Sequence, residues 1–334
     1  MKDIAQDLGV SVITVSKVIR NHSDIGEETR RRVLKRIQEL NYQPNLAARA
    51  LVTGKTFTAA LIVPSLVNPF FAELATGLTN ALRRKNYSLM MSSSEENPDL
   101  ERQEINRFLS RRVDAMMIAS MQLTPASFRN IEEQKTPYVL LDRRLSGLRA
   151  NFVGVDDVAV GRIATEHLID IGCKRIAHMR GPATSTSIGR MEGYYQALTR
   201  FGLTPFNGYV VMGRSPDVEA WKSGFDAMGS LLRLDPRPDG VFCYNDPTAI
   251  GAIDAILRAG LRVPEDIAVI GCGNLHYDKS LRVPLSSVDQ HSGEIGERAG
   301  KLSIALIEAK TCPRPRSIML EPTLVAREST RRNP

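Results

Sequence analysis

The chain has 334 residues, of which 43% are hydrophobic and 24% are charged, so it can form two or three domains with a large core. Its net charge is +7, and residues 1–55 hold ten Lys or Arg against six Asp or Glu. This charge fits an N-terminal module that contacts phosphate groups, although a solvated basic surface would look the same. There is no signal-peptide pattern, no apolar run of membrane length and no metal-ligand spacing among the cysteines, so we expect a soluble cytoplasmic protein with reduced thiols and no metal or cofactor.

Three short helices are predicted within the first 40 residues, in a spacing typical of a helix-turn-helix. Gly9 permits a left-handed turn after the first helix, and Ser11 is placed to cap the second, which runs to about Arg20. The third helix is predicted over 27–40, with basic residues on its solvent face at Arg30, Arg31, Arg32, Lys35 and Arg36. The residues predicted to face a shared core are Ile4, Ala5, Leu8, Val10, Val15, Val18, Ile19, Val33, Ile37 and Leu40.

The second helix leaves Val12, Ile13, Ser16 and Lys17 facing outward. A recognition helix of this kind enters the major groove of DNA with its N-terminal residues toward the base edges. Lys17 can donate to guanine, and Val12 and Ile13 can contact thymine methyl groups. The alternative is a three-helix packing unit that does not bind DNA.

The next segment, residues 42–51, is predicted to be a hinge. Pro44 ends an extended approach, Asn45 is placed to cap the next turn, and residues 46–51 are too few for a helix that is stable alone. Two copies lying side by side in a minor groove would stabilise each other, with Leu51 wedged between base steps. A plain contact between linker and core domain is the alternative for Leu51.

After a linker at 53–56, short apolar runs alternate with helical patterns. Strands are predicted at 59–63, 88–92, 115–119, 138–141, 175–179, 208–212, 240–243 and 267–270. Helices are predicted between them at 71–85, 100–111, 161–171, 191–201 and 248–259. This repetition predicts α/β architecture with doubly wound parallel sheets, and its length suggests two lobes. Ligands of such sheets bind at the carboxyl ends of the strands, which here means the cleft between the lobes.

Polar and aromatic residues follow several predicted strands. They include Asn68, Phe70 and Phe71 after the first strand, Asp142 and Arg143, residues 184–190, Asn245 and Asp246, and Asn274. Aromatic faces stack on sugar or base rings, and Asp, Asn and Arg side chains bind hydroxyl or carboxylate groups. Each residue alone is equally suited to a capping or turn role. Their convergence on one cleft favours a ligand site.

With these residues in view, the chain resembles the LacI family of bacterial transcriptional regulators over nearly its whole length. The matching stretches are 2–5, 10–18, 28–30, 40–45, 48–51, 68–71, 190–194 and 245–246. The resemblance implies a homodimer whose core is like periplasmic sugar-binding proteins, with effector binding that alters the hinge and the headpiece. It also implies base reading by Val12, Ile13 and Lys17, a minor-groove wedge at Leu51, and effector contacts by Arg190 and Thr186.

The chain departs from the family pattern most strongly at Gly273. The family usually has an aspartate there, which binds effector hydroxyls together with the arginine at position 190. Glycine has no side chain with which to accept a hydrogen bond from an effector hydroxyl. Loss of the carboxylate next to Arg190 would suit an anionic ligand, so our hypothesis is an effector such as a sugar acid or sugar phosphate. The alternative is that Asn274 or His276 takes over the contact. Two smaller departures are the missing helix-capping threonine before Met1 and Gly26 in place of a serine cap.

These patterns predict a headpiece at 1–44, a hinge and linker at 45–56 and a core at 57–334. One lobe of the core is expected at 57–158 and 289–317, and the other at 159–288 and 318–330. The candidate DNA contacts are Ser11, Val12, Ile13, Thr14, Ser16, Lys17, Asn21, Tyr42, Asn45, Ala48 and Leu51. The candidate effector contacts are Asn68, Phe70, Phe71, Asp142, Arg143, Thr186, Arg190, Trp221, Asn245, Asp246, Asn274 and Gln290.

The predicted function is a ligand-responsive repressor of carbohydrate-related genes that binds pseudo-palindromic operator DNA as a homodimer, away from membranes. The effector would be a sugar, sugar acid or sugar phosphate. The first alternative is a solute-binding protein without a DNA role, which the basic headpiece disfavours. The second is a sugar-processing enzyme, with Asp142, Asp246 and Asp289 as carboxylates, but binding or capping roles suit these residues better. No catalytic residue is therefore assigned.

Overall fold

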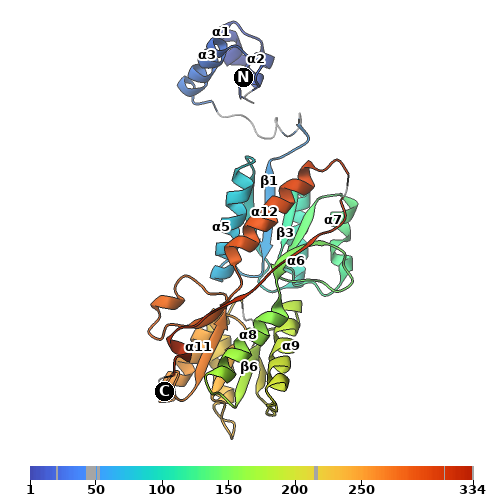
Figure 1. Cartoon of the computed structure of the whole chain (residues 1–334). Coiled ribbons are helices and arrows are strands. Elements are labelled where there is room, and N and C mark those ends of the chain that lie inside the picture. Colours follow the sequence, from blue (N-terminus) through green and yellow to red (C-terminus); the bar gives the residue numbers. More distant parts are fainter. Residues whose placement is uncertain (20–21, 43–49, 51–52, 214–216, 312, 333–334) are drawn as a thin grey trace. The chain divides into compact units, whose positions relative to one another are not determined.

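The computed structural model describes all residues except 20–21, 43–49, 51–52, 214–216, 312 and 333–334. The chain divides into two compact units, Met1–Thr56 and Phe57–Pro334 (Figure 1). We call them the headpiece unit and the core unit and describe each by itself. The predicted hinge at 45–51 lies almost entirely outside the described residues, as do Asn21, Asn45, Ala48 and Leu51.

The headpiece unit contains α1 (Lys2–Leu8), α2 (Val12–Ile19) and α3 (Glu27–Glu39). Its buried core is formed by Ile4, Ala5, Val15, Val18 and Val33, as the apolar spacing predicts. Gly9 ends α1 in the left-handed conformation, with φ of 63°. The Ser11 hydroxyl oxygen accepts a hydrogen bond from the backbone N–H of Thr14 at 3.0 Å, which caps the start of α2.

Two expectations for α3 were wrong. Leu40 is 43% exposed rather than inward, because α3 ends at Glu39 and Leu40 belongs to the turn that follows. Arg30 and Arg36 are partly covered rather than solvated. The Arg30 guanidinium donates to the carbonyl of His22, and Arg36 pairs with Asp7 on α1. These two basic side chains therefore help to hold the helices together.

The core unit holds two sheets, each with six strands among the described residues. The first has the order β11 (Ser317–Leu320), β5 (Asn151–Val155), β4 (Tyr138–Leu141), β3 (Ala115–Ile118), β1 (Thr58–Val63), β2 (Ser88–Ser93). The second has the order β12 (Thr323–Val325), β10 (Ser286–Asp289), β9 (Ala268–Cys272), β8 (Gly240–Cys243), β6 (Ile176–Arg180), β7 (Val210–Met212). All recorded pairings are parallel except that of β10 with β12. The α/β class and the parallel sheets are thus as predicted.

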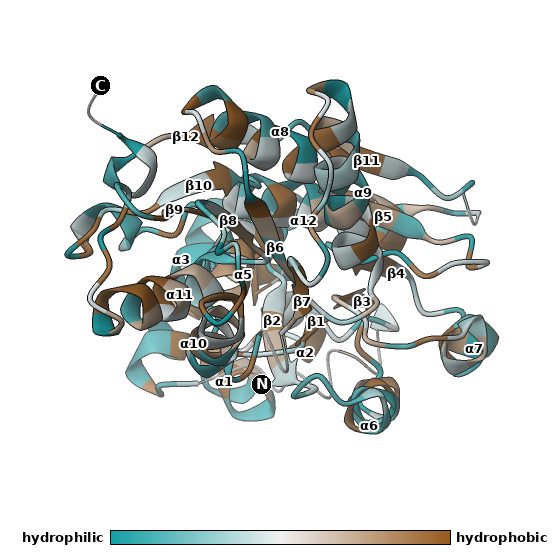
Figure 2. Cartoon of the chain, turned by 90° about the horizontal axis from the view of Figure 1, so that it is seen from below, coloured by the Kyte–Doolittle hydropathy of each residue, from teal (hydrophilic) through white to brown (hydrophobic). Residues whose placement is uncertain are grey.

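Helices cover both faces of each sheet. On the first sheet, α5 (Pro69–Arg83) and α12 (Ser292–Glu308) pack on one face, and α6 (Pro98–Ser110) and α7 (Arg129–Glu133) on the other. On the second, α8 (Asp157–Asp170) and α9 (Ser185–Arg200) oppose α10 (Ala220–Leu231) and α11 (Asp246–Arg258). Short 3₁₀ turns lie at Pro125–Phe128, Asp278–Ser280 and Glu328–Thr330. Figure 2 shows the central strands, such as β6, in hydrophobic brown and much hydrophilic teal on outer helices such as α7.

Glycines allow α8 and α9 to cross with their backbones in contact. A Cβ atom on Gly193 would lie 2.0 Å from the carbonyl oxygen of Val158, and one on Gly161 would lie 2.0 Å from that of Arg190. Neither backbone oxygen can move away without displacing its helix. The close crossing fixes α9, which carries Arg190, against the start of α8.

Strand β11 of the first sheet extends to Leu320, so the last passage of the chain to the second sheet lies beyond the lobe boundary at 317 that the sequence suggested. Strands β5, β10, β11 and β12 and helices α7, α10 and α12 were not predicted. The β10 segment Ser286–Asp289 has buried serines in place of the usual apolar run. Among the described residues, no helix is both long enough and apolar enough to cross a membrane.

Candidate functional site

The exposed face of α2 carries the residues that the sequence places against DNA. Val12 is 41% exposed and Ile13 is 69% exposed, whereas Val15 and Val18 on the opposite side are buried. The exposed side chains of Val12 and Ile13 leave this face of α2 available for contact with a partner. Lys17 is partly exposed on the same helix.

The other candidates for DNA contact have more local partners. The Ser11 and Thr14 hydroxyls lie 2.9 Å apart within the cap of α2. Tyr42 is half-buried and packs against the headpiece core. Ser16 lies partly exposed on α2.

Lys17 forms an ion pair with Asp24, in the turn that leads to α3. The hydrogen bond from the Lys17 ammonium lowers the pKa of the Asp24 carboxyl below its ordinary value. Both side chains are well exposed, at 40% and 54%, and exposed ion pairs contribute little free energy. Lys17 can therefore leave Asp24 for a base edge at small cost.

Replacing Lys17 with alanine should weaken binding to a specific operator by about 1–3 kcal/mol and relax the preference at one base position. Fluorescence anisotropy with a selected operator and its single-base variants measures both effects. Lys35→Ala is the matched control, because Lys35 is 77% exposed on α3. Equal losses of affinity for specific and non-specific DNA would show that Lys17 contacts only phosphate.

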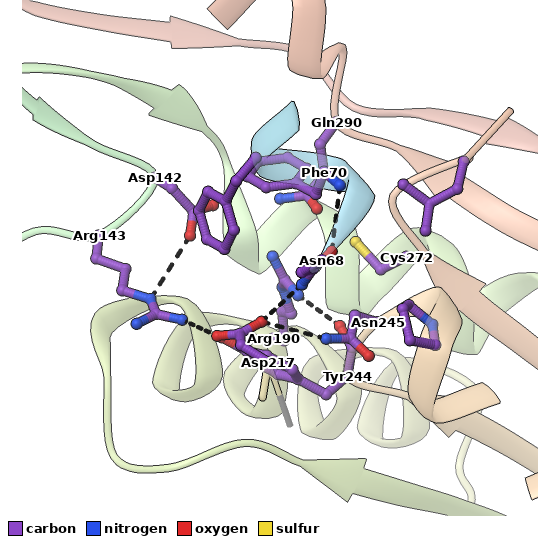
Figure 3. A pocket seen from close by; sticks show the side chains of 13 residues that line it. Asn68, Phe70, Asp142, Arg143, Arg190, Asp217, Tyr244, Asn245, Cys272 and Gln290 are labelled. Atoms are coloured by element: carbon purple, nitrogen blue, oxygen red, sulfur yellow. Dashed lines mark hydrogen bonds and ion pairs between the residues drawn. The ribbon is translucent and has the colours of Figure 1, made fainter. Parts of the chain in front are cut away.

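A cavity lies between the two sheets of the core unit, at the carboxyl ends of their strands (Figure 3). The free space within it is about 20 Å³. Its lining consists of Asn68, Phe70, Phe71, Asp142, Arg143, Arg190, Asp217, Tyr244, Asn245, Pro247, Cys272, Leu275 and Gln290. Eight of the twelve predicted effector contacts are in this set, so the topology brings together residues that are far apart in sequence.

Two asparagines have both a capping role and a place in the cavity. The Asn68 side-chain oxygen accepts the N–H of Phe70 at the start of α5, and that of Asn245 accepts the N–H of Thr248 in α11. Each amide nitrogen then donates to the same oxygen of Asp217, at 2.9 Å from Asn68 and 3.4 Å from Asn245. The capping hydrogen bonds fix the direction in which each amide nitrogen points. A helix-capping role and a place in the ligand site are therefore compatible for both asparagines.

Asp142 and Arg143 follow β4 and are almost fully buried. Burial raises the pKa of the Asp142 carboxyl, against the opposing effect of the Arg143 charge. The Arg143 Nε atom lies 3.7 Å from Asp142 Oδ2, and its Nη2 atom donates to Asp217. The guanidinium is therefore held between two carboxylates at the cavity wall (Figure 3).

Arg190 projects from α9 into the cavity and is 3% exposed. Its Nε atom donates to Asp157 Oδ1 at 3.0 Å, and Nη1 donates to the carbonyl oxygen of Tyr244 at 2.6 Å. The guanidinium carbon also lies 4.8 Å from the centre of the Tyr244 ring. These contacts hold the guanidinium in one orientation before any ligand arrives.

Aromatic side chains supply the apolar part of the lining. Phe70 and Phe71, in the first turn of α5, meet edge to face with ring centres 5.1 Å apart. Tyr244, which directly follows β8, also lines the cavity. Cys272, the last residue of β9, is another lining residue. The cavity thus combines ring faces with amides, carboxylates and guanidinium groups.

Four predicted effector contacts are absent from the cavity lining. Thr186 is buried beneath it, with its hydroxyl 3.0 Å from that of Tyr244. Trp221 is 45% exposed on α10 and stacks on Phe225. Asp246 and Asn274 bind other protein groups, as described below.

Gly273 lies close to the carboxylate of Asp246. Its φ is 139°, and a Cβ atom there would lie 2.9 Å from Asp246 Oδ2. Asn274 donates to Asp289 at 3.0 Å, and His276 lies 3.2 Å from Glu73. Neither Asn274 nor His276 appears in the cavity lining, so the structure gives no support to either as a substitute for the family aspartate.

Asp217 is a lining residue that the sequence reasoning missed. It lies between β7 and α10, and only 5% of it is exposed. Its position after a strand of the second sheet was a usable signal, because other cavity residues also follow strands. Asp217 is separated from the end of β7 by several residues, so its position after a strand was less evident than that of Asp142 or Asn245.

Asp246 lies in a buried cluster beside the cavity. It accepts hydrogen bonds from the Ser287 hydroxyl at 2.7 Å and from the N–H of Leu275 at 3.2 Å. Burial and the nearby Asp246 charge raise the pKa of the Asp278 carboxyl, against a smaller opposing effect of Arg327. The Asp246–Asp278 pair therefore retains a proton in the folded state that the unfolded chain releases.

The pKa of the pair is higher in the folded protein than in the unfolded chain. The contribution of the pair to the free energy of unfolding is therefore complete at a pH below the unfolded-state pKa, and it is lost as the pH rises through the folded-state pKa. Asp278→Asn should remove this proton. The melting temperature of the variant should fall less between pH 6 and pH 8.5 than that of the parent protein. Asp254→Asn, in which the replaced carboxylate is half-buried in an ion pair on α11, is the control. Parallel pH curves for Asp278→Asn and the parent would contradict the assignment.

In the part of the chain that the structure describes, no group of three or more His, Cys, Asp or Glu is arranged to hold a metal ion. Cys173, Cys243 and Cys272 are buried free thiols, and burial raises the pKa of each. The site therefore consists of a binding cavity and an exposed helix face.

Two family models match the chain. Residues 1–45 match the model described as bacterial regulatory proteins, lacI family, and residues 165–330 match a periplasmic binding protein-like domain. A ribose operon repressor of Escherichia coli is 34% identical, over 98% of this chain and 99% of that protein. The transcriptional repressor PurR of Pasteurella multocida is 33% identical, over 99% of this chain and 98% of that protein.

Solved structures give the same assignment. The lac repressor dimer bound to operator and the anti-inducer ONPF is 25% identical, with a TM-score of 0.84 and 98% of both chains covered. A complex of the transcriptional regulator CelR with cellobiose is 29% identical, with a TM-score of 0.75 and the same coverage.

Proposed function

Since the chain belongs to the lacI family of bacterial regulatory proteins, we propose that its core cavity binds a small carbohydrate effector, namely a sugar, sugar acid or sugar phosphate. The protein is a ligand-responsive, DNA-binding transcriptional repressor and not an enzyme.

The chemistry of the cavity supports a carbohydrate. Phe70, Phe71 and Tyr244 offer ring faces, while Asn68 and Asp142 offer donors and acceptors that suit hydroxyl groups. The observation that carries the proposal is that polar side chains from both sheets converge on one aromatic-lined space. The related ribose operon repressor and the CelR–cellobiose complex have carbohydrates in their names, which agrees with this class.

The two lobes of the core unit meet at the cavity. Asp217, beside the second sheet, is within hydrogen-bond distance of Asn68, which follows the first sheet. A molecule held between the two sheets must fit where single side chains now meet. A ligand of this kind contacts both lobes and therefore favours one arrangement of the lobes over another.

For the DNA side, we propose that the protein binds a pseudo-palindromic operator as a homodimer in the cytoplasm, with α2 in the major groove. The exposed Val12 and Ile13 and the available Lys17 support this orientation. The hinge at 45–51 and its wedge Leu51 remain predictions. We further propose that carbohydrate-related genes are the target, because effector and regulated pathway commonly share chemistry in such a switch.

A thermal-shift screen of the full chain against neutral sugars, sugar acids and sugar phosphates tests the effector class. We expect at least one carbohydrate to raise the melting temperature, because ligand binding to the folded state stabilises it. Calorimetry then gives the affinity and stoichiometry. Stabilisation by a purine base and by no carbohydrate would contradict the proposal.

A further inference from the structure

The cavity already contains a carboxylate that belongs to the protein. Asp217 Oδ1 accepts hydrogen bonds from the amides of Asn68 and Asn245, at 2.9 and 3.4 Å. Oδ2 accepts from the guanidinium of Arg143. All three side chains are at least nine-tenths buried. Donors from both lobes thus surround one carboxyl group, which is the arrangement of an anion-binding site.

Two features show that Asp217 fits this site imperfectly. The buried Arg143 Nε atom has no hydrogen-bond partner among the described residues, so Asp217 does not use the whole guanidinium fork. Glu96 also lies beside Asp217, with Oε1 accepting the Asp217 N–H at 3.3 Å. Burial, and then the charge of Asp217, raise the pKa of the Glu96 carboxyl. The position of Asp217 therefore brings two acidic groups together.

We propose that Asp217 occupies the subsite for an acid group of the effector, and that a carboxylate or phosphate on a small carbohydrate displaces it from Arg143, Asn68 and Asn245. The inference rests on the proposed carbohydrate function and narrows the effector to acidic members of that class. In the exchange, one anion replaces another on Arg143, so the buried guanidinium stays neutralised throughout. Asp217 acts as a specificity-determining residue, since a neutral sugar has no group that can replace its charge.

Asp217→Asn removes the internal competitor and leaves Arg143 with only the more distant carboxylate of Asp142, whose Oδ2 atom lies 3.7 Å from Arg143 Nε. Acidic ligands should then gain affinity, because they restore the missing charge. Glu219→Gln is a matched control. It makes the same charge change on the same connection before α10, but at an exposed side chain that makes no capping hydrogen bond.

Calorimetry on the full chain with D-ribonate, D-ribose 5-phosphate and D-ribose tests the proposal. At least one acidic probe should bind Asp217→Asn at least tenfold more tightly than the parent protein. D-ribose should gain no affinity, and Glu219→Gln should bind all probes as the parent does. Asp217→Ser serves as a second variant, and thermal unfolding verifies that both variants are folded.

Three results would overturn the inference. If D-ribose gains as much affinity as the acids, Asp217 only blocks space. If the acids bind Asp217→Asn no more tightly than they bind the parent, while D-ribose still binds, Asp217 is a hydroxyl ligand and the carbohydrate function stands. If no probe binds any of the proteins and no carbohydrate in the wider thermal-shift screen stabilises the chain, the proposed function fails together with the inference.

Discussion

Replacing Arg190 with methionine should lower the affinity for the effector by at least about thirtyfold, because truncating one partner of a buried charge pair costs about 2–5 kcal/mol. Asp157, the Tyr244 carbonyl and the Tyr244 ring together constrain the orientation of Arg190. Methionine fills part of the volume but supplies no donor. Calorimetry with the probe that binds the parent protein most tightly measures the loss.

A double variant separates binding from folding in this experiment. Removing Arg190 leaves Asp157 buried without its ion-pair partner, which destabilises the fold. Arg190→Met combined with Asp157→Asn removes the unpaired carboxylate and should recover much of the stability but not the affinity. Recovery of affinity in the double variant would mean that Arg190 only balances Asp157 and does not contact effector.

Gly193→Val should destabilise the core unit by about 3 kcal/mol or more, a value at the upper end for overpacked sites. The first added carbon would lie 2.0 Å from the carbonyl oxygen of Val158 and 2.6 Å from the backbone nitrogen of Arg162. Helices α8 and α9 must then separate, which also moves Arg190 away from Asp157. Chemical denaturation should show a lower midpoint, and effector affinity should fall as well.

The control for this experiment is Gly293→Ala on α12, where an added Cβ meets nothing within 4 Å. Alanine there should leave stability unchanged or raise it slightly, because it favours the helix. An unchanged denaturation midpoint in Gly193→Val would show that α8 and α9 are not held in backbone contact.

Sequence patterns predicted the architecture well where periodicity was strong. The alternation of apolar runs with helical patterns gave the main strands and helices, and apolar spacing in the first 40 residues gave the headpiece core. It missed β10, because Ser286 and Ser287 are buried polar residues that bind neighbouring chain segments. The burial of Leu40 was wrongly predicted because this residue lies just beyond the end of α3. The exposure of Arg30 was wrongly predicted because its guanidinium binds the carbonyl of His22, a tertiary contact that apolar periodicity does not reveal.

The cavity was predictable wherever a side chain directly follows a strand, as at Asn68, Asp142 and Asn245. Asp217 was missed because it is separated from β7 by several residues, and its role depends on partners contributed by the other lobe. Asp246 was placed in the cavity because it adjoins Asn245, but α11 turns its side chain toward Ser287 and Leu275. Asn245 and Asp246 are therefore adjacent in sequence, but Asn245 lines the cavity and Asp246 binds groups in the buried cluster beside it.

The departure at Gly273 acquires a physical context from the fold. The sequence suggested that loss of an aspartate next to Arg190 suits an anionic effector. The structure shows that Asp217 reaches the cavity from another segment and pairs with Arg143. The anionic-effector hypothesis therefore now depends on displacement of Asp217 rather than on an empty position.

The central claim is that the occupant of the cavity sets the affinity of the headpiece for DNA. Fluorescence anisotropy of the full chain on a selected pseudo-palindromic operator, with and without a saturating acidic probe that calorimetry shows to bind, tests it most directly. A coupling free energy of about 1–3 kcal/mol would change operator affinity by roughly 5–150-fold, in either direction. Arg190→Met combined with Asp157→Asn should bind operator without responding to the probe. Equal operator affinity of the parent protein with and without bound probe would contradict the account.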